Sequence, residues 1–162
     1  CYRSPVHRGA LTIGVISDTH GLVRPEALAA LAGAAHIVHA GDIGGPAVLD
    51  ALAAIAPVTA VRGNNDRDAW GRALPTTARL ELAGQCLYIL HDLGDLDLDP
   101  RAAGLDVVIT GHSHKPMQTR VDGVLHLNPG SAGPRRFKLP ISLARLRIVD
   151  AELTAELVTL PG

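Results

Sequence analysis

The sequence predicts an α/β fold, because short apolar runs typical of strands alternate with Ala- and Leu-rich helical segments in its first half. This alternation is characteristic of parallel strands in a sheet that is covered on its faces. A second observation is that polar side chains able to bind metal follow the ends of several of these strands. Ligands of open α/β sheets bind at the carboxyl ends of the strands, so this edge is the expected functional site.

The first half contains three expected strands and two expected helices. Each strand is a short apolar run, and each helix begins at a proline, which is favoured in the first helical turn. The strands are expected at residues 11–17, 36–40 and 58–62, and the helices at residues 25–31 and 46–55.

The second half is expected to consist mainly of strands. Ala83-Gly84-Gln85 and Asp122-Gly123 indicate the turns of two hairpins, and residues 99–104 suggest one or two helical turns. The expected strands are residues 78–82, 86–90, 107–110, 119–121, 124–127, 141–149 and 152–160. We therefore expect a single domain over residues 11–160, preceded by a mobile tail of residues 1–10.

Composition narrows the classes of function. The 162 residues, 47% of them hydrophobic, are sufficient for one core. The net charge of −1 and the four aromatic residues (one Trp, two Tyr and one Phe) do not indicate a nucleic-acid interface. With no apolar stretch of about 18 residues and no signal-peptide pattern, we expect a soluble, cytoplasmic protein that does not bind membranes.

Five short polar motifs follow expected strands, and together they predict a metal site. They are Asp18-Thr19-His20, Gly41-Asp42, Gly63-Asn64-Asn65-Asp66, His91-Asp92 and Gly111-His112-Ser113-His114. Taken singly, each has a simpler explanation, since Asp often caps a turn and His in a strand is often a core residue. Two carboxylates, one amide and four imidazoles in combination suit two divalent ions such as Mn, Fe, Zn, Ni or Co.

With these motifs, followed by Asn128-Pro129-Gly130-Ser131, the chain resembles calcineurin-like metallophosphoesterases over residues 11–149. It is most similar to the small bacterial and archaeal phosphodiesterase branch of that family. The resemblance implies a four-layer αββα sandwich, in which two mixed sheets pack face to face with helices outside. It also implies a dinuclear centre, with Mn as the first choice of metal.

The resemblance assigns a role to each ligand position. Asp18, His20 and His114 would hold the first metal, and Asn64, His91 and His112 the second. Asp42 would bridge the two ions. The turn at Asn128, Gly130 and Ser131 would support the site without ligating.

Two positions depart from the pattern of the family. Asn65 stands where many members have a His that protonates the leaving group, and an amide cannot deliver a proton. Asp92 stands where Gly usually follows the ligand His91. We expect Asp42, Asn65 and Asp66 to be the catalytic residues. Asn65 and Arg135 are the expected substrate contacts.

The expected function is hydrolysis of a small phosphodiester by direct in-line attack of a hydroxide that bridges the two metals. Two other functions stay open, namely a non-catalytic interaction scaffold like the eukaryotic retromer subunit of this fold, and a phosphomonoesterase or nuclease. The scaffold branch has lost site residues, whereas all seven ligand positions are filled here. Cap insertions or a basic groove would favour the last class, and neither is visible. The sequence does not indicate the natural substrate, and it leaves homo-oligomerisation open.

Overall fold

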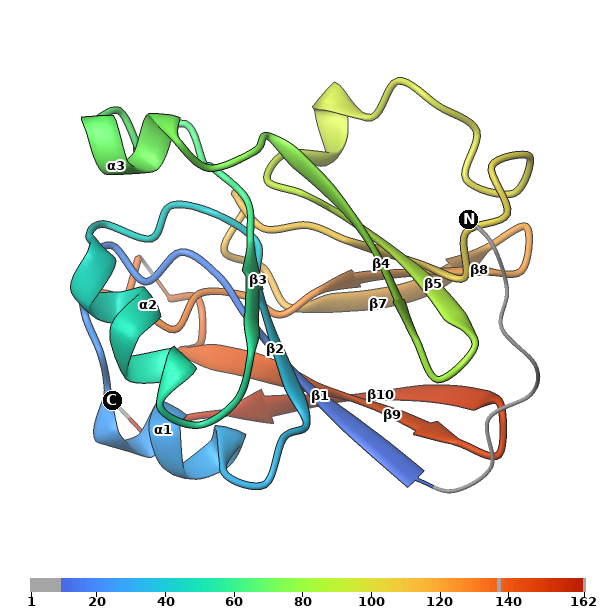
Figure 1. Ribbon diagram of the computed structural model, residues 1–162. Helices are drawn as coiled ribbons and strands as arrows, with labels where there is room; N and C mark the ends of the chain where they lie inside the picture. Colours follow the sequence, from blue (N-terminus) through green and yellow to red (C-terminus); the bar gives the residue numbers. More distant parts are fainter. Residues whose placement is uncertain (1–9, 137, 162) are drawn as a thin grey trace.

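The structure is a computed structural model that describes residues 10–136 and 138–161. Within these residues the chain forms two five-stranded sheets that pack face to face (Figure 1). Both sheets contain parallel and antiparallel pairs. The expected α/β sandwich with two mixed sheets is therefore confirmed.

The first sheet is built around three parallel strands. Its members are β1 (Ala10–Ile16), β2 (His36–His39), β3 (Val58–Ala60), β9 (Ser142–Val149) and β10 (Glu152–Thr159), in the order β10-β9-β1-β2-β3. Strands β1, β2 and β3 are mutually parallel, and β9 runs antiparallel to β1. The carboxyl ends of β1, β2 and β3 consequently lie at one edge of the sheet.

Two helices cover the outer face of this sheet. Helix α1 (Pro25–Leu31) and helix α2 (Pro46–Ala53) both have proline in their first turn, where its missing N–H is not needed. Leu31 of α1 and Leu52 of α2 are each 1% exposed and pack with Ile37 of β2 in one hydrophobic cluster. Burial of this apolar stripe holds both helices against the sheet.

The second sheet has the order β4-β5-β6-β8-β7. Its strands are β4 (Thr77–Leu82), β5 (Gln85–Leu90), β6 (Val107–Ile109), β7 (Met117–Val121) and β8 (Val124–Asn128). Strands β5, β6 and β8 are parallel, while β4 and β7 form the two antiparallel hairpins expected from the sequence.

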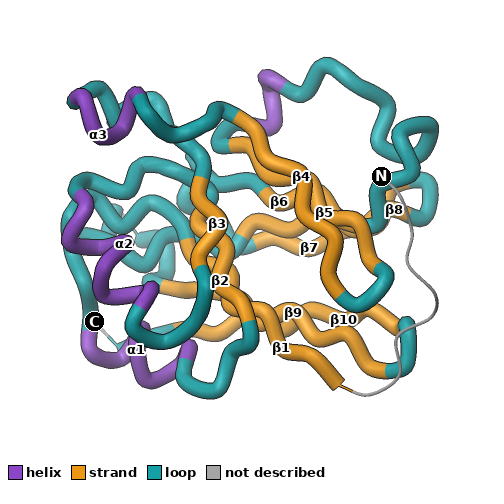
Figure 2. Tube along the Cα trace, viewed as in Figure 1, coloured by secondary structure: helices purple, strands orange, loops and turns teal. Residues whose placement is uncertain are grey.

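The outer face of the second sheet is covered mostly by loop. The chain between β5 and β6 contains one short 3-10 helix, η1 (Leu93–Asp95), and otherwise runs as turns (Figure 2). Residues 99–104, where one or two helical turns are expected, form a turn in which the Ala103 amide donates to the Asp99 carbonyl at 2.9 Å, without extending into a helix. Asp99 caps this turn by accepting a hydrogen bond from the Arg101 amide, and Gly104, with φ +74°, ends it after one turn. Leu96, Leu98 and other loop residues pack on the sheet.

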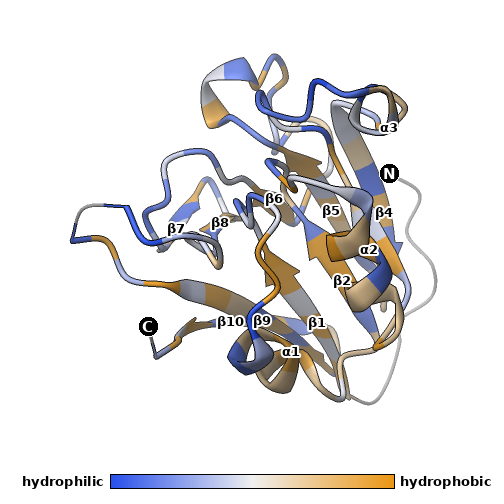
Figure 3. Cartoon of the chain, turned by 90° about the vertical axis from the view of Figure 1, so that its left-hand side faces the viewer, coloured by the Kyte–Doolittle hydropathy of each residue, from blue (hydrophilic) through white to orange (hydrophobic). Residues whose placement is uncertain are grey.

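The main core lies between the sheets. Ile13 and Val15 of β1 belong to one hydrophobic cluster with Leu87 and Ile89 of β5, and all four side chains are fully buried. In Figure 3 strands β1 and β5 are coloured mainly as hydrophobic. A single cluster thus joins strands of both sheets, and it is built from aliphatic residues as the composition predicts.

Several local features differ from expectation. Ala10, assigned to the tail, already belongs to β1, and the rest of the expected mobile tail lies outside the described residues. Helix α3 (Ala69–Arg72) was not expected, because a single turn of Ala-Trp-Gly-Arg has no helical periodicity to detect. Within the described part of the chain, none of the helices has the length and apolar character needed to cross a membrane.

Candidate metal centre

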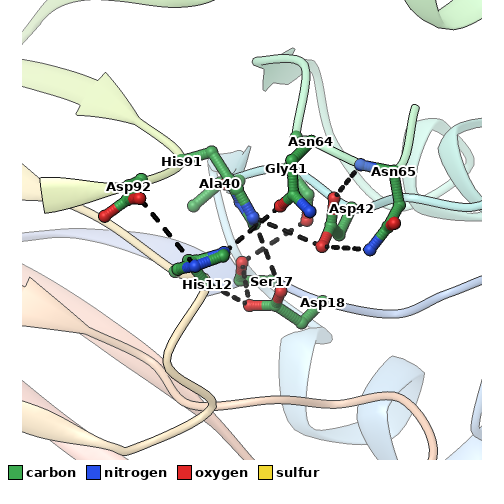
Figure 4. Close-up of polar contacts among 12 residues, drawn as sticks. Ser17, Asp18, Ala40, Gly41, Asp42, Asn64, Asn65, His91, Asp92 and His112 are labelled. Atoms are coloured by element: carbon green, nitrogen blue, oxygen red, sulfur yellow. Dashed lines mark hydrogen bonds and ion pairs between the residues drawn. The ribbon is translucent and has the colours of Figure 1, made fainter. Parts of the chain in front are cut away.

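The loops after β1, β2, β3, β5 and β6 meet at one edge of the sandwich (Figure 4). Backbone hydrogen bonds join them. The Asp18 amide donates to the Gly41 carbonyl at 3.0 Å, and the Gly111 amide donates to the His91 carbonyl at 2.9 Å. Donor side chains from five separate motifs are therefore brought together, as the position of each motif at a strand end predicts.

The predicted ligands share an uncommon backbone conformation. Nine described residues other than glycine have positive φ. Five of them are predicted ligands, namely Asp18 (55°), His20 (47°), Asp42 (54°), His112 (70°) and His114 (62°). The other four are Ala83, Asp122, Asp150 and Ala151, which lie in hairpin turns. Left-handed backbone at non-glycine residues is unfavourable and tends to cluster at functional sites.

Asp18, His20 and His114 form the first group of ligands. Their donor atoms lie within 4.8 Å of one another, and Asp18 Oδ1 is 3.4 Å from His114 Nε2. Asp18 Oδ1, His20 Nε2 and His114 Nδ1 are buried without a hydrogen-bond partner. Buried polar atoms are normally paired, so Asp18 Oδ1 and His20 Nε2 fit a bound cation, and the His114 atom that faces Asp18 is Nε2.

Asp18, Asp42 and His91 form a second group within the same 4.8 Å limit. The Nδ1 atom of His91 lies 2.8 Å from the Ala40 carbonyl oxygen, so it must carry the proton. Nε2 is then left with a lone pair that faces Asp42 Oδ2 at 3.3 Å. This arrangement, in which a backbone acceptor fixes the tautomer, is usual for a metal-ligating His.

Asn64 and His112 lie beside His91. Asn64 Oδ1 is 3.2 Å from His112 Nδ1, and the rings of His112 and His91 meet edge to face at 5.2 Å. Asp42 Oδ2 lies between His20 of the first ligand group and His91 of the second, 3.9 Å from His20 Nε2 and 3.3 Å from His91 Nε2. The seven predicted ligands thus lie around one edge of the sandwich, with Asp18 common to both ligand groups, and the bridging role expected of Asp42 stays a prediction.

The carboxylates are held from behind by polar contacts. Ser17 Oγ donates to Asp18 Oδ2 at 2.8 Å, and the His112 amide donates to the same oxygen at 3.1 Å. Oδ1 is left free for a cation. Ser131 Oγ donates to the Asp18 carbonyl, and the side-chain Nδ2 of Asn128 donates to the Gly111 carbonyl, so the turn 128–131 supports the site as expected. Sequence reasoning missed Ser17, whose only signal is its position before Asp18.

The three other predicted site residues have different surroundings. Asp66 is 2% exposed, and its carboxylate accepts hydrogen bonds from the amides of Ile43, Gly44 and Gly63. Its oxygens therefore hold two loops together, and the catalytic role expected of Asp66 stays a prediction. Asn65 donates from its backbone and its side chain to Asp42, at 2.8 and 3.0 Å. Arg135 Nε donates to the Leu139 carbonyl of its own loop, and the substrate contact expected of Arg135 stays a prediction.

Burial and hydrogen bonding set the charges of the site. Burial tends to raise the pKa of Asp42, but the contact with His91 and the hydrogen bonds from Asn65 outweigh it and hold the pKa below its usual value. Burial raises the pKa of Asp18, against the opposing effect of His91. Burial acts to lower the pKa of His91, but contact with Asp42 raises it overall. The site therefore contains an anion poised for a cation at Asp42.

His39 supports the site from the core. It is fully buried, it accepts a hydrogen bond from the Gly41 amide through Nδ1, and its Nε2 lies 3.0 Å from Thr19 Oγ1. Thr19 Oγ1 in turn donates to the Ile43 carbonyl. Burial lowers the pKa of His39 to about 3. A neutral imidazole thus joins the loops that carry Asp18 and Asp42.

Comparison with known proteins identifies the family. Residues 11–151 match the model of the calcineurin-like phosphoesterase superfamily domain. A probable metallophosphoesterase of Methanothermobacter thermautotrophicus is 36% identical over 160 residues, which cover 91% of this chain and 92% of that protein. The chain belongs to the calcineurin-like phosphoesterase superfamily, whose members use divalent metal ions.

Two solved structures illustrate the range of this fold. An archaeal phosphodiesterase superimposes with a TM-score of 0.76 at 23% identity, covering 91% of this chain and 100% of its own. The Vps29 protein of Entamoeba histolytica, solved in complex with Zn²⁺, superimposes with a TM-score of 0.68 at 25% identity, covering 92% and 99% of the two chains. At 23% identity, the similarity to the archaeal phosphodiesterase concerns the fold alone.

Gly41→Ala tests how closely the loops are packed. Gly41 has φ +103°, and a Cβ there would lie 2.6 Å from His91 Nδ1, so we expect the variant to displace His91 and to lower metal affinity at least ~10-fold. Gly33→Ala is the matched control, since Gly33 has φ +82° and open space around it. Calorimetric titration with Mn²⁺ measures both. Equal affinities in the two variants would contradict this packing.

The buried His39 predicts a pH dependence of stability. Its pKa is 6.5 when unfolded and about 3 when folded, so the unfolded state binds the extra proton as the pH falls below 6.5. The contribution of His39 to the free energy of unfolding should be constant above pH 6.5. Below pH 6.5 it should fall by about 1.4 kcal/mol per pH unit. Urea unfolding of metal-free protein at pH 7 and pH 5 should therefore show a smaller loss for His39→Gln than for wild type.

His126→Gln serves as the control for this measurement, because burial lowers the pKa of the half-buried His126 without placing it in the core. It should retain most of the wild-type pH dependence. If wild type and His39→Gln lose the same free energy of unfolding between the two pH values, the assignment of His39 as a neutral buried group is wrong.

Proposed function

We propose that this chain is a dinuclear, metal-dependent phosphodiesterase that hydrolyses small phosphodiesters. The observation that carries the proposal is the set of buried donor atoms without hydrogen-bond partners on Asp18, His20, His91 and His114. These atoms come from separate strand ends and share one location, which supports a cluster of cations rather than a structural hydrogen-bond network.

The ligands would be divided between two ions. Asp18, His20 and His114 would hold one ion, Asn64, His91 and His112 the other, and Asp42 both. The mixed oxygen and nitrogen donors favour Mn, with Ni, Zn, Fe or Co as alternatives. When bound, such a pair of ions activates a water molecule for direct in-line attack and neutralises charge on the phosphate.

The protein supplies the geometry for this chemistry. The low pKa of Asp42 keeps its carboxylate charged, and the two hydrogen bonds from Asn65 orient it. The Ala40 carbonyl fixes the tautomer of His91. Ser17 and the His112 amide occupy one oxygen of Asp18 and leave the other for the metal.

The charge balance favours an anionic substrate. Two divalent ions beside two carboxylates leave a net charge of about +2, which attracts a phosphate ester. Asn65 cannot act as a general acid, and its side chain is engaged with Asp42. A phosphodiester whose leaving group departs without proton transfer from position 65 suits this arrangement better than a monoester.

The scaffold function of some proteins with this fold is the second candidate. It is less well supported, because all seven ligand positions carry competent donors here. Left-handed backbone at non-glycine residues and buried unpaired donors are both unfavourable, and a protein that only binds a partner through its surface does not need them. We accordingly propose a small-molecule substrate and a cytoplasmic location.

Asp42→Asn tests the proposal directly. The change keeps the size of the side chain but removes its charge between the two ion positions, so hydrolysis of bis(p-nitrophenyl) phosphate by Mn-loaded protein should fall at least ~100-fold. Wild type should hydrolyse this diester with a higher kcat/KM than p-nitrophenyl phosphate.

Asp50→Asn, on the exposed side of α2, is the control and should keep full activity. Circular dichroism should show that both variants fold. An active, metal-replete Asp42→Asn protein would show that the bridge is assigned wrongly, and a preference for the monoester would reject phosphodiesterase specificity.

A further inference from the structure

Two cavities flank the candidate metal centre, and Asp92 and His112 line both of them. The larger has a volume of about 530 Å³ and the smaller about 380 Å³. Asp92 Oδ2 lies 3.8 Å from His112 Nε2 (Figure 4), and Asp92 Oδ1 accepts a hydrogen bond from the Gly94 amide at 3.0 Å. This pair forms a partition between two lobes of one site.

The larger cavity is negatively charged. We call it the acidic lobe, and the side chains that define it are Arg62, Thr77, Tyr88, Asp92, Asp95 and Asp97. Three carboxylates outnumber one guanidinium, so a positively charged group is favoured in it. His91 also lines this cavity, is 6% exposed, and has a buried Nε2 without a hydrogen-bond partner. The acidic lobe therefore opens onto the buried centre itself.

The smaller cavity has the opposite character. We call it the apolar lobe, which is lined by Leu93, Pro116 and Met117 together with Lys115. Leu93 is 40% exposed, although an apolar side chain of this size is normally buried. The ammonium group of Lys115 disfavours a second cation in this lobe. A neutral aliphatic or aromatic group fits here.

We propose that the two lobes bind the two ester groups of an asymmetric phosphodiester, with an alkylammonium group in the acidic lobe and an apolar group in the apolar lobe. This inference rests on the phosphodiesterase function proposed above. The phosphate would lie at the partition, beside His91, Asn64 and His112, which line the acidic lobe at its inner end. A monoester has only one ester group and would leave one lobe empty.

The same arrangement selects against nucleic acids. A polynucleotide would carry a further phosphate into a lobe with three carboxylates, where like charges repel. The acidic lobe therefore distinguishes a short zwitterionic diester from a polyanion.

Two matched esters test the proposal. The p-nitrophenyl ester of phosphocholine carries an apolar arm and a cationic arm, and p-nitrophenyl 3,3-dimethylbutyl phosphate is its uncharged isostere. For wild type we expect KM to be about three- to ten-fold lower for the choline ester, since each exposed charge contact contributes modestly. The difference should shrink at high salt, because screening weakens it.

Variants of each lobe should separate the two contributions. Asp95→Asn/Asp97→Asn should raise KM for the choline ester and remove the difference between the esters. Asp50→Asn/Asp122→Asn makes the same change of net charge away from both cavities and should preserve the difference. Leu93→Ser should raise KM for both esters equally, because they share the p-nitrophenyl arm.

The outcomes distinguish this inference from the proposed function. Equal KM values for the two esters in wild type, or an unchanged preference in Asp95→Asn/Asp97→Asn, would overturn the assignment of the lobes while hydrolysis continues. If neither ester is hydrolysed, the proposed phosphodiesterase function is wrong. The intact esters can then be titrated into Mn-loaded protein by calorimetry, where tighter binding of the choline ester supports the lobes and equal binding overturns them.

Discussion

The structure depends on the burial of two carboxylates, Asp18 and Asp42, beside imidazoles at the edge where the two sheets meet. Asp18 is 0% exposed and Asp42 3% exposed, and Asp18 Oδ1 has no hydrogen-bond partner. An unpaired buried charge costs several kcal/mol, whereas a divalent cation at the same position would reverse the sign of that contribution. Imidazoles lie beside both carboxylates, with His91 Nε2 3.3 Å from Asp42 Oδ2 and His114 Nε2 3.4 Å from Asp18 Oδ1.

The fold tolerates this concentration of charge because the surrounding loops hold it in place. Left-handed backbone at five ligand positions is stabilised by contacts that converge on them. Asp66 joins the loop after β3 to the loop after β2, and His39 joins the loop after β2 to Thr19. At Gly41 and Gly63, the loops approach so closely that a Cβ would meet His91 or Asp42. The buried charge and left-handed backbone of the site thus lower the stability of the fold, and the aliphatic core beneath the site offsets this loss.

Much of the fold and of the site can be predicted from the sequence because both follow from strand periodicity. Apolar runs locate the strands to within one or two residues, and the rule that ligands gather at carboxyl ends then brings Asp18, Asp42 and His91 together. The loop that covers the second sheet could not be predicted, since Leu96 and Leu98 pack without helical periodicity. Nor could the role of Asp66, because the backbone amides that it binds come from loops whose approach the sequence does not encode locally.

Crystallography with anomalous scattering from Mn-soaked crystals tests the central claim most directly. Two anomalous peaks per chain are predicted, one among Asp18, His20 and His114 and the other among Asn64, His91 and His112, with Asp42 contacting both. A single peak, or peaks away from these residues, would contradict a dinuclear centre at the edge of the two sheets.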